Sequence, residues 1–354
     1  MSLNIYMSIY NTLSESQKVR VANFFKEHGL IHAHELGVKR TSEDYTKEDL
    51  DNLLSFCNKN AIQPNNVVVS ESTLCINQHS PFLHVHLPIH LINHFAIVEV
   101  EDVAPSKHFN FLAGNYHYDR FMLLQGLYQK DLLKCTHWSA YRNIDTELHR
   151  QHHFTENFLN FCNTQIPRTM KNLDVHNLYP EDVLHESLYI KNSFVKDSNN
   201  ADGIIFKDSA ITITVDTMAN TIPSVYESKW HEVEKVSGLT MYYTPKIIKP
   251  IKHKRPFINL LGKGKSADKY LQDMGFKTFN NFWSEDYYQA DTPKQRVDLV
   301  LDLCYNLSKE NISDIHNNTK DLCEYNYNIL TKTDWIEWYL NQIQTTLVIR
   351  QATT

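Results

Sequence analysis

The sequence predicts an α/β protein in which short buried strands alternate with amphipathic helices. Residues 67–69 and 210–215 are apolar, largely β-branched runs of the length expected for buried strands. Residues 14–27 and 291–307 carry apolar side chains at helical spacing, and Ser14 can cap the first of these helices. The other expected elements are strands at residues 3–10, 96–100, 108–112 and 256–261 and helices at residues 41–57, 120–133 and 335–347.

Length and composition indicate a globular protein of two domains, and we place their boundary at Pro105, between residues 1–104 and 105–332. Of the 354 residues 42% are apolar, and the net charge of −6 gives no general attraction to nucleic acid or anionic lipid. Six scattered cysteines without a CxxC pair fit reduced thiols, and no stretch is apolar for long enough to span a membrane. We therefore expect a cytoplasmic protein.

The stretch of residues 224–288 concentrates the polar chemistry of the predicted second domain. An expected strand ends in Glu227, a lysine-rich helix start contains Lys246 and Lys249, and the apolar run that follows stops at Gly262. Ligands of α/β proteins bind beyond the carboxyl ends of the strands, where helix N-termini offer N–H groups to phosphates. A carboxylate and several ammonium groups in that zone suggest a phosphorylated ligand that carries a ribose.

A second phosphate-binding turn is expected where residues 108–112 lead into the helix at residues 120–133. Gly114 and Asn115 form the turn, and the guanidinium of Arg120, at the start of the helix, can pair with a phosphate oxygen. The alternative is an ordinary strand-to-helix connection with a solvated arginine.

The order of these motifs resembles that of the glycosyltransferase-like proteins of phages and large DNA viruses, which are distantly similar to α1,3-fucosyltransferases. Their Thr-Glu-Lys triplet corresponds to Thr244, Pro245 and Lys246, so the carboxylate of the triplet is missing here. Arg296 matches a basic position of the family, but we expect it on a solvated helix face. The other matches are Glu227, Gly114, Asn115, Arg120, Lys249-Pro250, Pro256-Phe257, Gly-Phe-Lys-Thr-Phe at residues 275–279 and Glu285-Asp286-Tyr287.

The resemblance implies a GT-B-type fold, with two Rossmann-like lobes, an interlobe cleft and a final helix at residues 333–354 that can cross back onto the first domain. It also implies a glycosyltransferase with a UDP- or GDP-sugar donor, whose leaving diphosphate is neutralised by basic side chains rather than by a metal ion. The residues assigned to the donor site are Lys246, Glu227, Arg120, Lys249, Gly114, Asn115 and Thr244.

The acceptor side needs a general base from the first half of the chain. Glu71, which follows the strand at residues 67–69, is the candidate, and the histidines between residues 79 and 94 are alternatives. The Asp-x-Asp pattern at residues 49–51 falls inside an expected helix, so we interpret it as a solvated face rather than a metal site.

The sequence leaves the acceptor open between DNA that carries 5-hydroxymethylcytosine and a glycan. A DNA acceptor predicts a cleft lined by Lys and Arg and steep salt dependence. A glycan acceptor predicts aromatic platforms, for which Trp138, Tyr141, Trp230 and Tyr242 are available. If the chain is viral, it is expected in the host cytoplasm. The alternative function is a non-catalytic binding protein that keeps the GT-B-like fold, which the loss of the motif glutamate at Pro245 favours.

Overall fold

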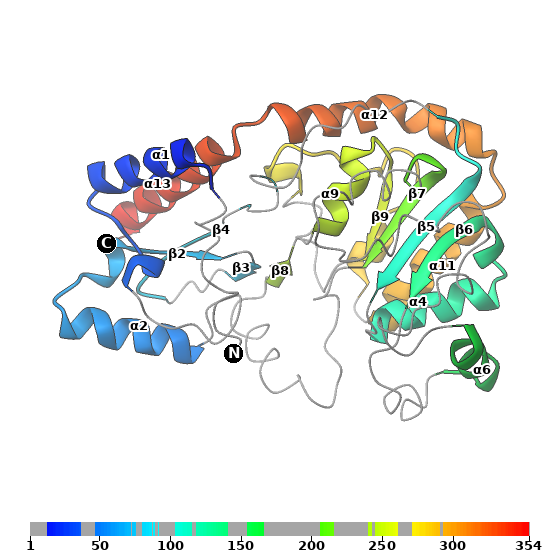
Figure 1. Cartoon of the computed structure of the whole chain (residues 1–354), viewed down its shortest axis with the longest axis horizontal. Coiled ribbons are helices and arrows are strands. Elements are labelled where there is room, and N and C mark those ends of the chain that lie inside the picture. Colours follow the sequence, from blue (N-terminus) through cyan, green and yellow to red (C-terminus); the bar gives the residue numbers. More distant parts are fainter. Residues whose placement is uncertain are drawn as a thin grey trace. The chain divides into compact units, whose positions relative to one another are not determined.

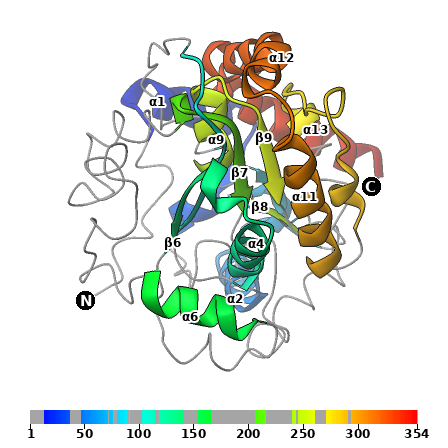
Figure 2. The ribbon, with the colours of Figure 1, turned by 90° about the vertical axis from the view of Figure 1, so that its right-hand side faces the viewer.

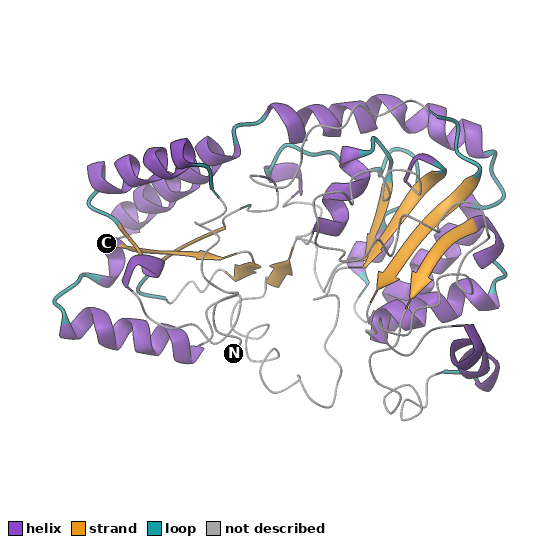
Figure 3. Cartoon of the chain, in the orientation of Figure 1, coloured by secondary structure: helices purple, strands orange, loops and turns teal. Residues whose placement is uncertain are grey.

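The computed structural model describes an α/β protein with two parallel sheets, of three and four strands (Figures 1 and 3). The chain divides into two compact units. The first unit comprises Met1–Ala96, Val225–Tyr243 and Lys332–Thr354, and the second comprises Ile97–Ser224 and Thr244–Thr331. The residues that the structure describes are 13–36, 47–71, 73–75, 80–86, 88, 91, 103–114, 118–140, 154–165, 206–215, 240–242, 245–260, 271–290 and 293–353.

The sheet of the first unit is covered by helices on both faces. Strands β1, β2 and β4 pair in parallel in this order, and β3 and β8 form a separate antiparallel pair. None of the described helices is both long and apolar enough to cross a membrane. The elements of this unit are α1 Glu15–Glu27, β1 Ile31–His32, η2 Ala33–Leu36, α2 Lys47–Lys59, η3 Pro64–Asn66, β2 Val67–Glu71, β3 Thr73–Cys75, β4 Leu83–His86, β8 Thr240–Tyr242 and α13 Trp335–Thr353.

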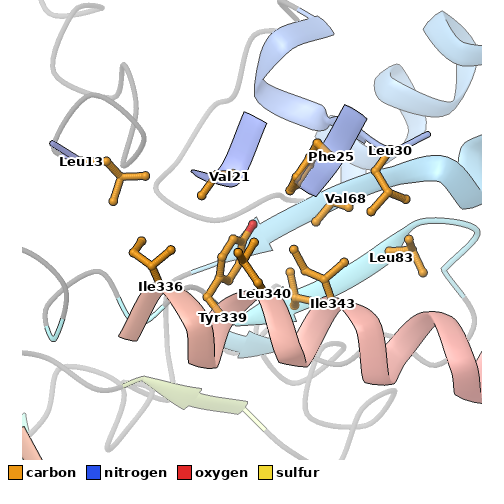
Figure 4. Packing of buried hydrophobic residues seen from close by; sticks show 11 residues of the cluster. Leu13, Val21, Phe25, Leu30, Val68, Leu83, Ile336, Tyr339, Leu340 and Ile343 are labelled. Carbon is orange, nitrogen blue, oxygen red and sulfur yellow. The ribbon is translucent and has the colours of Figure 1, made fainter. Parts of the chain in front are cut away.

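Alternation along β2 divides the core of the first unit into two clusters. Val68 packs against Phe25 of α1 and Ile343 of α13 on one face (Figure 4). Val67 and Val69 pack with the apolar side of α2 on the other face. All three valines are fully buried, which confirms the strand that their β-branched run predicts.

Side-chain caps fix the two helices that cover the first of these faces. Ser14 accepts a hydrogen bond from the backbone N–H of Gln17, whose side chain accepts one from the backbone N–H of Ser14, a capping box that confirms the expected helix start. Asp334 Oδ1 caps α13 by accepting from the N–H groups of Ile336 and Glu337. Arg20 of α1 pairs with both Asp334 and Glu337, and so links α1 to the start of α13.

The sheet of the second unit has the strand order β6-β5-β7-β9, and all its neighbours are parallel. The chain passes from β5 to β6 on one side and then crosses to β7 on the other side of β5. The elements of this unit are β5 Lys107–Gly114, α4 Tyr118–Gln129, η4 Leu133–Cys135, β6 Thr136–Ala140, α6 Glu156–Gln165, β7 Ser209–Val215, α9 Pro245–Lys252, β9 Phe257–Leu260, η7 Asp286–Gln289, α11 Pro293–Leu307 and α12 Ile312–Lys332.

Helices cover both faces of this sheet as well. Helix α9 packs against β7 and β9, while α4 and α11 pack against each other on the opposite face (Figures 1 and 2). The connection β5–α4–β6 runs across the sheet in one direction, and the connection β7–α9–β9 runs in the other. Because both crossovers are right-handed, α4 and α9 lie on opposite faces of the sheet. Every residue of β7 is buried, as expected for a central strand with both faces covered.

The contact between α4 and α11 depends on the absence of a side chain at Gly126. A Cβ atom there would lie 2.0 Å from Leu301 Cδ1 and 2.9 Å from Leu301 Cγ. Leu301 is buried and cannot swing into solvent. We expect Gly126→Ala to lower the free energy of unfolding by about 1–2 kcal/mol, because overpacking outweighs the better helix propensity of alanine.

The matched control is the same substitution in a Leu301→Ala background. Without the leucine, Gly126→Ala should stabilise the protein by up to about 1 kcal/mol, as helix propensity alone predicts. Urea denaturation of the four proteins measures both effects, and equal effects in the two backgrounds would contradict this packing.

Candidate functional site

The carboxyl edge of the second sheet holds the turn that the sequence singled out. Strand β5 ends at Gly114, α4 begins at Tyr118, and Arg120 is the third residue of the helix. Arg120 is only 4% exposed, so the alternative interpretation of a solvated arginine is wrong. A buried guanidinium in the first turn adds its charge to the N–H groups and positive dipole end of the helix, and this combination favours an anion.

Helix α9 directs its first turn toward the same edge. It is joined to β9 by the short connection of residues 253–256, and hydrogen bonds from His253 N to Lys249 O and from Arg255 N to Pro250 O tighten that turn. Because α9 and β9 run in opposite directions, the N-terminal turn of α9 lies near the carboxyl end of β9. Lys246 is the second residue of this helix; the structure describes its backbone and not its side chain.

Lys249 lies one turn further along α9 and is half-buried. Its charge is among those that lower the pKa of His253, near the other end of the helix. Lys249 is therefore farther from the carboxyl edge than Lys246 is. Three further candidates for the donor site, Glu227, Asn115 and Thr244, lie outside the described residues.

The carboxyl edge of the first sheet carries a hydrogen-bonded chain that the sequence did not reveal. His32 Nε2 lies 2.9 Å from Ser70 Oγ, and Ser70 Oγ lies 2.6 Å from the hydroxyl of Tyr339 in α13. The backbone of Glu71, the candidate base, follows directly and pairs in register with His86 of β4. No periodicity links His32, Ser70 and Tyr339, because the three residues come together only when α13 packs on the sheet.

Two side chains expected on solvated helix faces are buried instead. Arg296 of α11 is 2% exposed and its Nη2 donates to the carbonyl of Ala290 at 3.2 Å. Asp49 of α2 is fully buried, whereas Asp51 is exposed. Among the side chains that the structure describes, no group of three His, Cys, Asp or Glu residues could hold a metal ion.

The Gly-Phe-Lys-Thr-Phe run at residues 275–279 belongs to the core of the second unit. Phe276 and Phe279 are buried, and Phe279 packs edge-on against Phe257 of β9. Asn326 of α12 holds the run, because its side chain accepts from Lys277 N and donates to Lys277 O. Residues 275–279 therefore stabilise the core of the second unit. The side chains assigned to the donor site lie in other segments of the chain.

No protein-family model, curated protein or solved structure matches the chain. The family resemblance and the functions it implies therefore stay hypotheses, and the assignment of a function depends on the geometry of the two sheets.

Proposed function

We propose that the protein is a glycosyltransferase that moves a sugar from a UDP- or GDP-sugar to an acceptor hydroxyl. In this proposal its two parallel sheets belong to two Rossmann-like lobes of GT-B type, the first on the acceptor side and the second binding the donor. The observation that carries this proposal is the strand order of the second sheet. The chain leads from β5 to β6 on one side and then from β6 to β7 on the other side of β5, so the carboxyl ends of the neighbouring strands β5 and β7 form a topological switch point. Open α/β sheets bind ligands at such points.

The basic groups at that point suit the diphosphate of a sugar nucleotide. Arg120 lies in the first turn of α4, directly after β5, and Lys246 lies in the first turn of α9. Departure of the nucleoside diphosphate concentrates negative charge on its phosphate oxygens, and cations together with helix N-termini stabilise that charge. Lys249, Thr244, Gly114 and Asn115 complete the proposed donor site, and Glu227 accepts hydrogen bonds from the ribose or sugar hydroxyls.

The acceptor proton goes to a base at the carboxyl edge of the first sheet, where we keep Glu71 as the candidate. The acceptor itself is either DNA that carries 5-hydroxymethylcytosine or a glycan. Transfer to DNA should weaken steeply as salt rises, whereas transfer to a neutral glycan should not.

The second candidate function is a binding protein of the same fold without catalysis. Pro245 favours it, because the residue is the first of α9, a position that suits proline, and brings no carboxylate to the site. Donor hydrolysis separates the two functions. A transferase releases nucleoside diphosphate from its donor slowly even without acceptor, whereas a binding protein only retains the donor.

We expect Arg120→Gln to lower the rate of donor hydrolysis or transfer by about 10- to 100-fold, because one charge-assisted interaction with the leaving group is lost. Arg120→Lys keeps a cation and should lose less activity. Release of UDP or GDP measures the effect. Equal rates for the wild type and Arg120→Gln, with the fold intact by circular dichroism, would exclude Arg120 from the donor site.

A further inference from the structure

The second sheet carries a buried polar ladder on one of its faces. Asn110 Nδ2 of β5 donates to Thr212 Oγ1 of β7 at 2.9 Å, and Thr214 Oγ1 donates to Asn259 Oδ1 of β9 at 2.7 Å. Asn110 is in register with Thr212, and Thr214 is in register with Asn259. Because Thr212 and Thr214 are two residues apart on one strand, all four side chains share one face.

Each asparagine of this ladder has one amide end bonded to a threonine and one end open. Asn110 Oδ1 and Asn259 Nδ2 have no hydrogen-bond partner among the residues that the structure describes, and both asparagines are fully buried. Turning either amide around would exchange its nitrogen and oxygen but would still leave one end facing away from the threonine. The open ends therefore do not depend on how the amides are assigned.

The two open ends cannot satisfy each other. Asn110 and Asn259 lie on strands separated by β7, so roughly 10 Å, two strand spacings, lie between them. Buried amide groups in native proteins almost always have a hydrogen-bond partner, and one left without any is strongly unfavourable.

We propose that the second unit binds ordered water on this face, with one molecule bonded to Asn110 Oδ1 and another to Asn259 Nδ2. Water fits because one open group is an acceptor and the other is a donor, and a water molecule can serve either. This site is independent of the proposed function, since the ladder lies within the sheet and all four of its residues are buried.

A crystal structure of the full chain tests the proposal directly. It should show a density peak for water within about 3 Å of each open amide end. Density for a protein group or another ligand at these positions, or no peak at either end, would overturn it.

Apolar replacement of the ladder gives a second test in solution. The double variants Asn110→Leu/Thr212→Val and Thr214→Val/Asn259→Leu each remove one threonine–asparagine pair at nearly constant shape. If water satisfies the open ends, each variant unfolds at the same temperature as the wild type or a few degrees lower. A rise of several degrees would mean that the ends are unsatisfied in the wild type and that no water is bound.

Discussion

Replacing Arg255 with methionine should lower the free energy of unfolding by at least about 3 kcal/mol. This arginine is 3% exposed and lies between α9 and β9. Its Nε donates to Phe206 O at 2.9 Å, and its Nη2 donates to Val103 O at 2.9 Å and to Lys207 O at 2.6 Å. Its Nη1 lies 2.7 Å from His316 Nδ1, and because arginine only donates, His316 Nδ1 is the acceptor.

One guanidinium thus joins α12 to the segments that precede β5 and β7. Methionine keeps the apolar stem but leaves three carbonyl groups and the His316 ring without their donor. Arg255→Lys should cost less, because its ammonium group can still reach some of these acceptors. The exposed control is Arg20→Ala, which removes only surface ion pairs and should cost under about 1 kcal/mol. An Arg255→Met variant as stable in urea as Arg20→Ala would contradict this account.

Acid should destabilise the second unit through His253. This side chain is buried and stacks on Phe206 at 4.9 Å between ring centroids, with only 6° between the ring planes. Its pKa is lowered to about 3, first by burial and then by the charges of Lys252, Lys249 and neighbouring basic residues. The unfolded chain protonates histidine near the ordinary pKa of about 6.5.

The sign of the effect follows from that difference in pKa. Between pH 6.5 and about 3, His253 binds a proton in the unfolded state but stays neutral in the folded state. The contribution of neutral His253 to the free energy of unfolding is therefore complete above pH 6.5 and is lost as the pH falls. The loss approaches about 1.4 kcal/mol for each pH unit, or about 2 kcal/mol by pH 5.

The variant His253→Phe isolates this contribution, because phenylalanine keeps the stacked ring and cannot titrate. The stability of the wild type relative to His253→Phe should fall by about 2 kcal/mol from pH 6.5 to pH 5. Urea denaturation at a series of pH values measures the difference, since the other titrating groups are common to both proteins. Parallel stability curves would show that protonation of His253 is not coupled to unfolding.

The elements that the sequence predicted are those with a strong local signal. The β-branched runs at residues 67–69 and 210–215 are buried strands, and residues 14–27 and 291–307 form helices close to their expected bounds. The helix expected at residues 120–133 ends at Gln129, because Asp131 has a left-handed φ of 57°. The strands expected at residues 3–10 and 96–100 lie outside the described residues.

Elements without such a signal escaped prediction. Strand β6, Thr136–Ala140, is short and contains His137 and Ser139, and helix α12, Ile312–Lys332, is rich in polar side chains. Both depend on tertiary contacts: β6 pairs along β5, and α12 is tied to the rest of the unit by Asn326 and by the contact between His316 and Arg255.

Predictions about individual side chains were less secure than predictions about elements. Helical spacing locates Arg296 and Asp49 on their helices but cannot show that a neighbouring layer covers them, so both were wrongly expected in solvent. For Arg120, burial excludes the alternative of a solvated side chain, while its contact with a phosphate stays a prediction. The bond between Ser70 and Tyr339 spans 269 residues, and no local pattern predicts it.

Calorimetric titration of UDP- and GDP-sugars into the full chain and into Lys246→Ala tests the central claim most directly. Lys134→Ala is the matched control, because this exposed lysine lies beside the amino end of β6, at the opposite edge of the same sheet. We predict that one class of donor binds the wild type and Lys134→Ala equally and binds Lys246→Ala at least about 10-fold more weakly, a loss of about 1.4 kcal/mol. A wild-type protein that binds none of these donors would contradict the proposed function, and equal binding to Lys246→Ala would contradict the placement of the diphosphate.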